Sequence, residues 1–489
     1  TILADGTALL AGGVTRDGGL AGIEIDIVFD GGAYITMSPV VLSRGAIHAA
    51  GPYAWPAVQI DAVAYRTHTP PNGAFRGFGV PQVAFAIECF VDELAHAAGI
   101  EPHDFRLRNR LRPGDRTATS QVLDHTVASR EVLEQALART DFAARRAEPD
   151  GDGAVARGVG MSLFWHGAGF TGGGEARIAA EVALDLADDG RAHIRVSSTD
   201  MGQGAHTVLP QIAAESLGVP TDHVVVDPVD TAQVPDSGPT VASRTTMIVG
   251  GELALAAADA RAFLLAEVAA ERGLEAEQLR LERGQVLAGE QPLGSFAELV
   301  PRVLSRRGEQ RRAFLRRHQL APQLRWDEAR HRGDAYATFA WGCCVAEVEL
   351  DLRLYEVRVP RLTMVVDVGR AVNPTLARGQ VEGGAMQALG YALSEEVGVT
   401  PEGSLLRDRF QTYIVPTTLD APQIDVVLVE VPYGRGPGGA KGLGEMPMNG
   451  AAPAVANALH NALGARVRDL PLSPERIFAA VRGLEATDD

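Results

Sequence analysis

The chain has 489 residues, and its 46% apolar and 22% charged residues are ordinary for globular proteins. At this length we expect more than one hydrophobic core, and we exclude disordered, collagen-like and small disulfide-rich classes. The net charge of −17 argues against nucleic acid as a partner, and the lack of a long apolar run argues against a membrane partner or span.

The chain contains 3 cysteines, Cys89, Cys343 and Cys344, and none belongs to a C-x-x-C pair. It therefore cannot supply the four thiolates of a zinc or iron–sulfur site. So few cysteines indicate a reducing compartment, and we expect a cytoplasmic protein. The first residue is Thr1, and strand-like sequence follows closely. We therefore expect that upstream sequence is missing, which leaves room for an N-terminal signal.

The first third of the sequence predicts a strand, a helix and a connecting segment. Residues 22–34 alternate apolar and polar side chains before a pair of glycines, which indicates a strand and a turn. Residues 81–98 place their apolar side chains on one face, and this spacing predicts a helix that ends at Gly99. The polar, arginine- and proline-rich residues 110–155 indicate a connection between domains.

From Arg157 onward, strand-like and helix-like segments alternate. The expected strands are residues 177–186, 192–199, 344–351 and 363–368, and the expected helices are residues 207–218, 247–272, 374–395 and, as the final helix, 451–463. Residues 302–332 hold 10 arginines that share no helical face, which favours a solvated linker over an anion-binding or partner patch. A glycine-rich loop is expected at residues 434–450.

Common catalytic motifs are missing from the sequence. There is no G-x-S-x-G, no H-E-x-x-H and no phosphate-binding G-x-x-x-x-G-K-[ST]. GRGPGG at residues 434–439 matches the dinucleotide-binding pattern literally and follows a strand-like run. However, Pro437 interrupts it, and no helix is expected directly behind the glycines to receive a phosphate. A nicotinamide-dependent dehydrogenase is therefore the least favoured hypothesis.

Four glycine-rich loops each present one polar side chain. The loops GAFRGFG, MGQGAHT, GQVEGG and AKGLGE present Arg76, Gln203, Gln380 and Glu445. Glycine lets the backbone approach a bulky ligand and frees amide groups to bind its oxygens. One such loop is typical of a tight turn, but four together predict a large polar cofactor clamped between two domains. Glu445 lies among small apolar residues, so we expect a raised pKa and a role as a base.

These segments, together with PTVAS at residues 239–243, resemble the molybdenum-cofactor subunit of the xanthine dehydrogenase / aldehyde oxidase family of molybdenum hydroxylases. The resemblance covers nearly the whole chain. It implies that Glu445 is the catalytic base and that the pterin, not a side chain, holds the molybdenum, with Arg76 and Ala242 nearest to it. The cofactor contacts that it implies are Arg76, Gly77, Gly202, Gln203, Ala242, Ser243, Gln380 and Gly444.

Four further residues resemble the substrate-binding positions of the purine-oxidising branch. Phe78 and Phe170 match two phenylalanines that sandwich a flat ring, and Thr171 matches a substrate-binding hydroxyl. Arg44 matches a purine-binding arginine that aldehyde-oxidising relatives generally lack, and the alternative for Arg44 is a surface salt bridge. Arg244, beside Ser243, is expected to narrow the pocket.

The resemblance also implies an architecture and a set of partners. We expect an α+β fold of two elongated molybdopterin-binding domains, built of mixed sheets and helices, with the cofactor between them. Residues 1–112 would be the C-terminal part of the first domain, residues 113–155 the connecting segment and residues 156–489 the second domain. The cofactor would be molybdopterin cytosine dinucleotide. Partner subunits would carry [2Fe–2S] centres and FAD, and a further polypeptide could carry the missing N-terminal half.

The activity implied is hydroxylation of an electron-poor carbon in an N-heteroaromatic, purine-like substrate. Water supplies the oxygen, and two electrons pass to the iron–sulfur and flavin subunits. Two alternatives stay open, namely an aldehyde dehydrogenase of the same family and a catalytically silent fragment or scaffold subunit.

Overall fold

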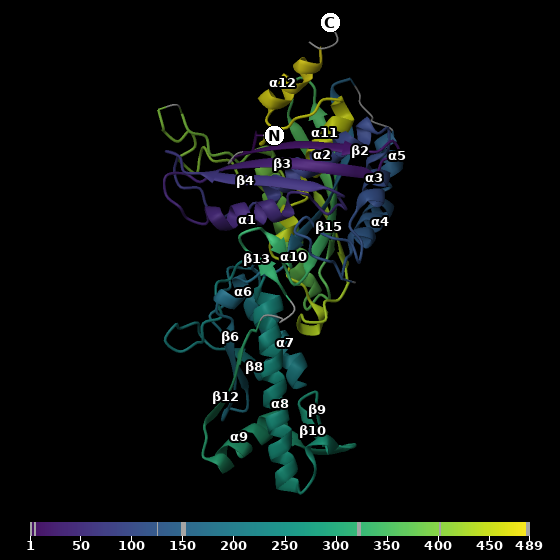
Figure 1. Cartoon of the computed structure of the whole chain (residues 1–489). Helices are drawn as coiled ribbons and strands as arrows, with labels where there is room; N and C mark the ends of the chain where they lie inside the picture. The colour runs from purple at the N-terminus through teal and green to yellow at the C-terminus, as the bar shows by residue number, and fades with distance from the viewer. Residues whose placement is uncertain are drawn as a thin grey trace.

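A computed structural model describes residues 2–3, 6–124, 126–147, 153–319, 324–400 and 402–485. The molecule is elongated and has two lobes (Figure 1). The lower lobe runs from α6 (Gly174–Arg177) to β12 (Arg311–Arg317). The upper lobe contains the elements on either side of it in the chain, from β1 to β5 and from β15 to α12.

The first sheet of the upper lobe has the strand order β1-β2-β3-β4. Its strands are β1 (Ile2–Leu3), β2 (Gly6–Val14), β3 (Leu20–Asp30) and β4 (Val58–Tyr65). Side chains along β3 alternate between buried and exposed, so the strand and turn predicted at residues 22–34 are confirmed. α1 (Ser38–His48) connects β3 to its parallel neighbour β4 and carries Arg44 into the interior.

The helix predicted at residues 81–98 is also confirmed as α2 (Val80–Ala97), which is followed by Gly99 in the left-handed region. The remaining helices of the upper lobe are α3 (Pro102–Asn109), α4 (Ser129–Thr140), α5 (Phe142–Ala147), α10 (Pro374–Leu393), α11 (Ala451–Leu463) and α12 (Pro474–Glu485). Residues 110–155 therefore include two helices, and α4 packs against β15 and β16. The helix at 451–463 is not the final one, because α12 follows it.

The second sheet of the upper lobe has the order β17-β16-β15-β5. Its strands are β5 (Val155–Gly167), β15 (Phe339–Asp351), β16 (Val357–Asp367) and β17 (Gln423–Val429). α11 packs closely on β5, where Gly160 leaves room for it, since a Cβ there would lie 2.1 Å from the backbone nitrogen of Ala458. This packing fixes the C-terminal end of β5, which carries His166 into the candidate site.

The lower lobe has a sheet of order β12-β6-β7-β8 packed against long helices. Its elements are β6 (Glu181–Ala187), β7 (Ala192–Arg195), α7 (Ala205–Leu217), β8 (Val224–Val226), α8 (Gly250–Arg272), β9 (Leu279–Glu282), β10 (Gln285–Ala288), β11 (Gln291–Ser295), α9 (Phe296–Arg307) and β12. Two short strands, β13 (Trp326–Asp327) and β14 (Arg332–Gly333), follow β12 in the chain. Within the described ranges, no helix is long and apolar enough to cross a membrane.

The solvated linker predicted at residues 302–332 is wrong for residues 302–317, and residues 320–323 lie outside the described residues. Its first half forms the end of α9 and the edge strand β12. Arg306 and Arg307 pair with Glu267 of α8, and Arg316 pairs with Asp259 of the same helix. The acidic partners of these arginines lie far away in the sequence. The segment has few apolar residues, and arginines stand between them. Periodicity alone therefore could not find these elements.

Candidate active site

A cavity of about 600 Å³ lies where residues of the two lobes meet. α7 and residues 240–246 contribute from the lower lobe, and α10 and residues 440–445 contribute from the upper lobe. Ten of the residues singled out from the sequence line it, namely Arg76, Phe78, Gly202, Gln203, Ala242, Ser243, Arg244, Gln380, Gly444 and Glu445. The glycine-rich segments thus come together from positions far apart in the chain.

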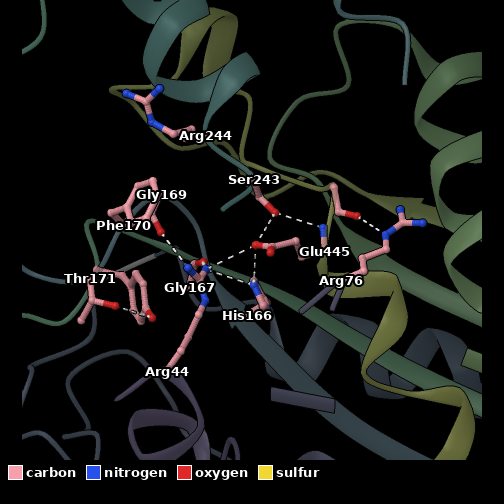
Figure 2. A network of polar contacts seen from close by, with 12 residues as sticks. Arg44, Arg76, His166, Gly167, Gly169, Phe170, Thr171, Ser243, Arg244 and Glu445 are labelled. Atoms are coloured by element: carbon pink, nitrogen blue, oxygen red, sulfur yellow. Dashed lines mark hydrogen bonds and ion pairs between the residues drawn. The ribbon is translucent and has the colours of Figure 1, made fainter. Parts of the chain in front are cut away.

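Arg76 crosses from its loop to the segments that carry Gln380 and Glu445. Its Nε donates to the carbonyl oxygen of Gly444 at 2.6 Å (Figure 2), and its Nη2 donates to the carbonyl oxygen of Gln380 at 3.2 Å. Gly77 and Phe78 follow with φ of 101° and 49°, a left-handed turn that leads directly into α2. The turn places Phe78 in the cavity wall and directs the backbone N–H of Gly77 to Glu445.

GQVEGG is not a loop, and that prediction is wrong. The segment lies inside α10, where its glycines remain helical. Gly384 allows close packing, because a Cβ there would lie 3.2 Å from Cζ of Arg76. The first four residues of MGQGAHT do form a loop before α7, with Gly202 at φ 103°, and its last three residues begin the helix. Gln203 spans that loop, since its Oε1 accepts from the backbone N–H of Met201 and its Nε2 donates to the carbonyl of Thr199.

Glu445 is 7% exposed and lies at the centre of a polar network (Figure 2). Its Oε2 lies 3.1 Å from Nε2 of His166, 3.6 Å from Nη2 of Arg44 and 3.4 Å from Oγ of Ser243. The same Ser243 hydroxyl accepts the backbone N–H of Glu445 at 3.0 Å. Burial raises the pKa of Glu445, but the charge of Arg44 and the hydrogen bond from His166 outweigh it and lower the pKa to about 2. The expected raised pKa is therefore wrong.

His166 is a residue of this network that the sequence analysis missed. It ends the buried strand β5, and its Nδ1 accepts from Nδ2 of Asn449 at 3.2 Å. The Asn449 amide also donates to the carbonyl of Trp165, and Nε2 of His166 lies between Oε2 of Glu445 at 3.1 Å and Nη2 of Arg44 at 3.0 Å. A polar residue at the end of a long apolar strand, just before a glycine-rich turn, was the only signal in the sequence.

Arg44 is 1% exposed, so the alternative of a surface salt bridge is wrong. Its Nη2 donates to the carbonyl of Gly167, and its Nη1 donates to the carbonyl of Gly169. Its Nε is buried and has no hydrogen-bond partner among the described residues. Arg44 does not line the cavity itself and contacts it through Glu445.

Phe170 and Thr171 lie beside the network but outside the cavity wall. The hydroxyl of Thr171 lies 3.0 Å from that of Tyr336, and the backbone N–H of Phe170 donates to Glu175. Arg244 lines the cavity, yet its guanidinium points away from Glu445 (Figure 2) and is bound by Glu175. The ion pair holds the Arg244 head group out of the space in front of Glu445.

Two buried histidines predict an acid-sensitive fold. Burial is the main cause that lowers the pKa of His48 and His166 from the ordinary 6.5, and Arg44 lowers both further. Below pH 6.5 the unfolded chain takes up protons that the folded chain does not, so stability is full above that pH and is lost as the pH falls. Each histidine contributes at most about 1.4 kcal/mol per pH unit. Urea unfolding between pH 7 and 5.5 measures this loss, which His166→Gln should reduce. If the free energy of unfolding of His166→Gln falls with pH as steeply as that of the wild type, His166 is excluded as a cause of the acid sensitivity.

The two lobes thus border a glycine-lined cavity of a size suited to a large polar ligand, with a buried carboxylate in its wall. Two family models, both described as "Molybdopterin cofactor-binding domain", match residues 135–422 and 7–110. The chain therefore belongs to the molybdopterin cofactor-binding family of xanthine dehydrogenase and aldehyde oxidoreductase subunits. This confirms the predicted family and α+β fold.

Relatives from several organisms match almost all of the chain. It is 31% identical to the xanthine dehydrogenase molybdenum-binding subunit of Escherichia coli O157:H7, over 95% of this chain and 61% of that protein. Quinoline 2-oxidoreductase from Pseudomonas putida 86 superimposes with a TM-score of 0.85 at 27% identity, over 98% of this chain and 62% of that one. The aldehyde oxidoreductase of Desulfovibrio desulfuricans ATCC 27774 superimposes with a TM-score of 0.82 at 27% identity, over 97% of this chain and 48% of that one. The chain thus spans about three fifths of the curated relative's length.

Proposed function

We propose that this chain is the cofactor-binding part of a molybdenum hydroxylase that oxidises an electron-poor carbon of an N-heteroaromatic, purine-like substrate. Water supplies the oxygen, and two electrons leave the substrate for partner subunits. The observation that carries the proposal is the ionised Glu445 carboxylate, held by Arg44, His166 and Ser243 at the wall of the large cavity. The named relatives that act on xanthine and quinoline support the substrate class.

The residues in the cavity wall fit a molybdenum-bearing pterin. Gly202 leaves open space, since a Cβ there would meet no atom within 4 Å, and Gln203, Gln380 and Ser243 offer donors and acceptors suited to a heterocycle. The residues that we expect to hold the cofactor are Arg76, Gly77, Gly202, Gln203, Ala242, Ser243, Gln380 and Gly444. When bound, the cofactor supplies a metal centre that accepts two electrons.

In the proposed reaction, Glu445 removes the proton from the attacking water-derived oxygen. His166, Arg44 and Ser243 all contact Oε2, so we assign Oε1 as the proton acceptor. A carboxylate with a pKa of about 2 is a weak base in this resting arrangement. A substrate oxygen bound by Arg44 would draw the guanidinium charge away from Glu445 and raise the pKa of the carboxyl. Substrate binding would then activate the base.

Phe78, Phe170 and Thr171 are the proposed substrate-positioning residues. Phe78 lines the cavity, and Phe170 and Thr171 lie on the loop whose carbonyls bind Arg44. The aromatic rings would orient a flat heterocycle by stacking. The hydroxyl of Thr171 would hydrogen-bond the substrate.

Substrate class is tested with the natively purified protein, heteroaromatic and aldehyde panels, and an artificial electron acceptor. We expect heterocycle oxidation with oxygen derived from labelled water. Arg44→Lys keeps a positive charge near Glu445 but loses the two-pronged guanidinium. It should lower kcat/KM for heterocycles by about 10-fold or more, and less for aldehydes. Turnover of aldehydes alone would favour the alternative, an aldehyde dehydrogenase of the same family, which the Desulfovibrio structure represents.

We also propose the remaining parts of the complex. The three cysteines are buried and too few for an iron–sulfur cluster, so partner subunits would carry [2Fe–2S] centres and FAD. The cofactor would be the cytosine dinucleotide form, and the complex would be cytoplasmic. Residues 1–112 and 156–489 would be the two cofactor-binding domains, with residues 113–155 connecting them.

A further inference from the structure

Arg244 and Glu175 form a buried ion pair beside the candidate active site. Arg244 is 1% exposed and Glu175 is 5% exposed. Nε of Arg244 lies 3.2 and 3.1 Å from the two carboxylate oxygens, and Nη2 lies 3.0 Å from Oε2. The guanidinium also donates to the carbonyls of Ser237 and Ala179. Arginine is the side chain whose planar fork of donors suits such a set of oxygens.

The pair joins two segments that border the network of Glu445. Glu175 accepts the backbone N–H of Phe170 at 2.9 Å through the same Oε1 that Arg244 contacts. One residue earlier, the N–H of Gly169 donates to the carbonyl of Ala242 at 2.9 Å. Residues 167–175 are therefore fastened to residues 242–244 by two contacts, one through side chains and one through the backbone.

The turn at Ala242 and Ser243 is conformationally strained. Both residues adopt the left-handed region, with φ of 56° and 52°, which residues other than glycine rarely do. Gly442 lies against this turn, because a Cβ there would be 2.0 Å from the carbonyl oxygen of Ser243. The strained turn aims the Ser243 hydroxyl at Glu445. Such a turn persists only where its surroundings hold it in place.

The contacts form a closed ring that includes the proposed base. Ser243 contacts Glu445, Glu445 pairs with Arg44, and Arg44 donates to the carbonyl of Gly169. Gly169 then bonds Ala242, next to Ser243. The ion pair of Arg244 with Glu175 lies across this ring and ties it to Phe170.

We propose that the Arg244–Glu175 ion pair is a positioning element that fixes the Phe170 loop relative to Glu445 and thereby sets how a planar substrate is oriented. The inference rests on the proposed function for its substrate, but the placement of the loop can be measured without turnover. Neither residue contacts the reacting atoms in this role. Arg244 acts through Glu175, and Glu175 acts through the backbone of Phe170.

The test uses the natively purified protein with Arg244→Met, Arg244→Lys, Glu175→Ala and Glu175→Gln. Hydrogen exchange is followed in peptides that cover residues 164–176. Glu175→Ala removes the acceptor of the Phe170 amide, and Arg244→Met removes the partner that holds this acceptor in place. Both variants should therefore speed exchange at Phe170 by about 10-fold or more. Glu175→Gln keeps an amide oxygen at that place and should restore most of the protection. If Arg244→Met fails to fold, the more conservative Arg244→Lys takes its place. Arg244→Lys should give an exchange rate between those of the wild type and Glu175→Ala.

Arg195→Met is the matched control. Arg195 makes a similar two-pronged contact with the buried Asp185, at 2.9 and 3.1 Å, within the sheet of the lower lobe. Its loss should affect stability without changing exchange at Phe170. Unchanged exchange at Phe170 in both Arg244→Met and Glu175→Ala would overturn the proposal. Equally faster exchange at Phe170 in the control Arg195→Met would also overturn it.

Kinetics separate the positioning role from a general structural one. Arg244→Met should raise KM for a heterocycle by about 10-fold and change kcat much less, with molybdenum content unaltered. Faster exchange with an unchanged KM would overturn the role in substrate orientation. If the wild type oxidises no heterocycle while exchange responds as expected, the positioning of the loop is supported and the proposed substrate class fails.

Discussion

Replacing Lys441 with methionine is expected to lower the free energy of unfolding by about 3–5 kcal/mol. Lys441 is the chain's only lysine, and its side chain is fully buried against an equally buried Asp367 at the end of β16. Its Nζ also donates to the carbonyl of Thr126 at 2.8 Å, and its backbone N–H donates to the carbonyl of Val368 at 3.0 Å. Methionine fills the same space but leaves the Asp367 carboxylate without its counter-charge.

Urea unfolding of the single and double variants measures this effect. Asp367→Leu combined with Lys441→Met removes both charges and should recover much of the lost stability, because a buried pair replaced by apolar groups is often neutral. Arg370→Met, at an exposed neighbouring position, is the control. A loss of less than about 1 kcal/mol in Lys441→Met would mean that the ion pair does not anchor this loop. Since Glu445 lies four residues further on, the same pair fixes the segment that carries the proposed base.

Replacing Glu445 with glutamine is expected to lower turnover by about 100-fold or more while bound molybdenum stays unchanged. Glutamine has nearly the same shape and can still accept the hydrogen bond from His166. It cannot take up a proton, however, and general base catalysis contributes about 10²–10⁴ in rate. The content of metal should be unaffected because the proposed cofactor contacts are made by residues other than Glu445.

The measurement is steady-state kinetics beside metal analysis of the same preparations. Glu382→Gln is the matched control, since Glu382 lies on α10 near Gln380 but outside the cavity wall. It should keep wild-type turnover. Retained activity in Glu445→Gln would show that another group is the base. Loss of molybdenum together with activity would instead assign Glu445 a role in holding the cofactor.

The sequence analysis found most elements whose signal is local. The helix at α2 and the strand at β3 have clean periodicity, and both were predicted within a few residues. α9 and β12 were missed because their arginines are satisfied by Glu267 and Asp259, which only the fold brings near. The helix expected at residues 374–395 is confirmed as α10, but the loop expected for GQVEGG inside it is wrong, because Gly384 makes room for Arg76 rather than forming a turn.

The candidate site was predicted in its parts but not in its electrostatics. The segments that carry Arg76, Gln203, Ser243 and Glu445 do line one cavity. The direction of the pKa shift of Glu445 was wrong because its neighbours in the sequence are apolar, while its partners Arg44 and His166 lie hundreds of residues away. His166 carries no motif of its own, so only the packing of β5 reveals it.

The most direct test of the central claim is metal and nucleotide analysis of the natively purified protein with whatever subunits accompany it. The proposed cofactor predicts near-stoichiometric molybdenum and, after acid release, an equivalent amount of CMP. Protein that is folded and complete with its partners but contains no molybdenum would contradict the account. Glu445 would then not be the base of a molybdenum-dependent oxidation.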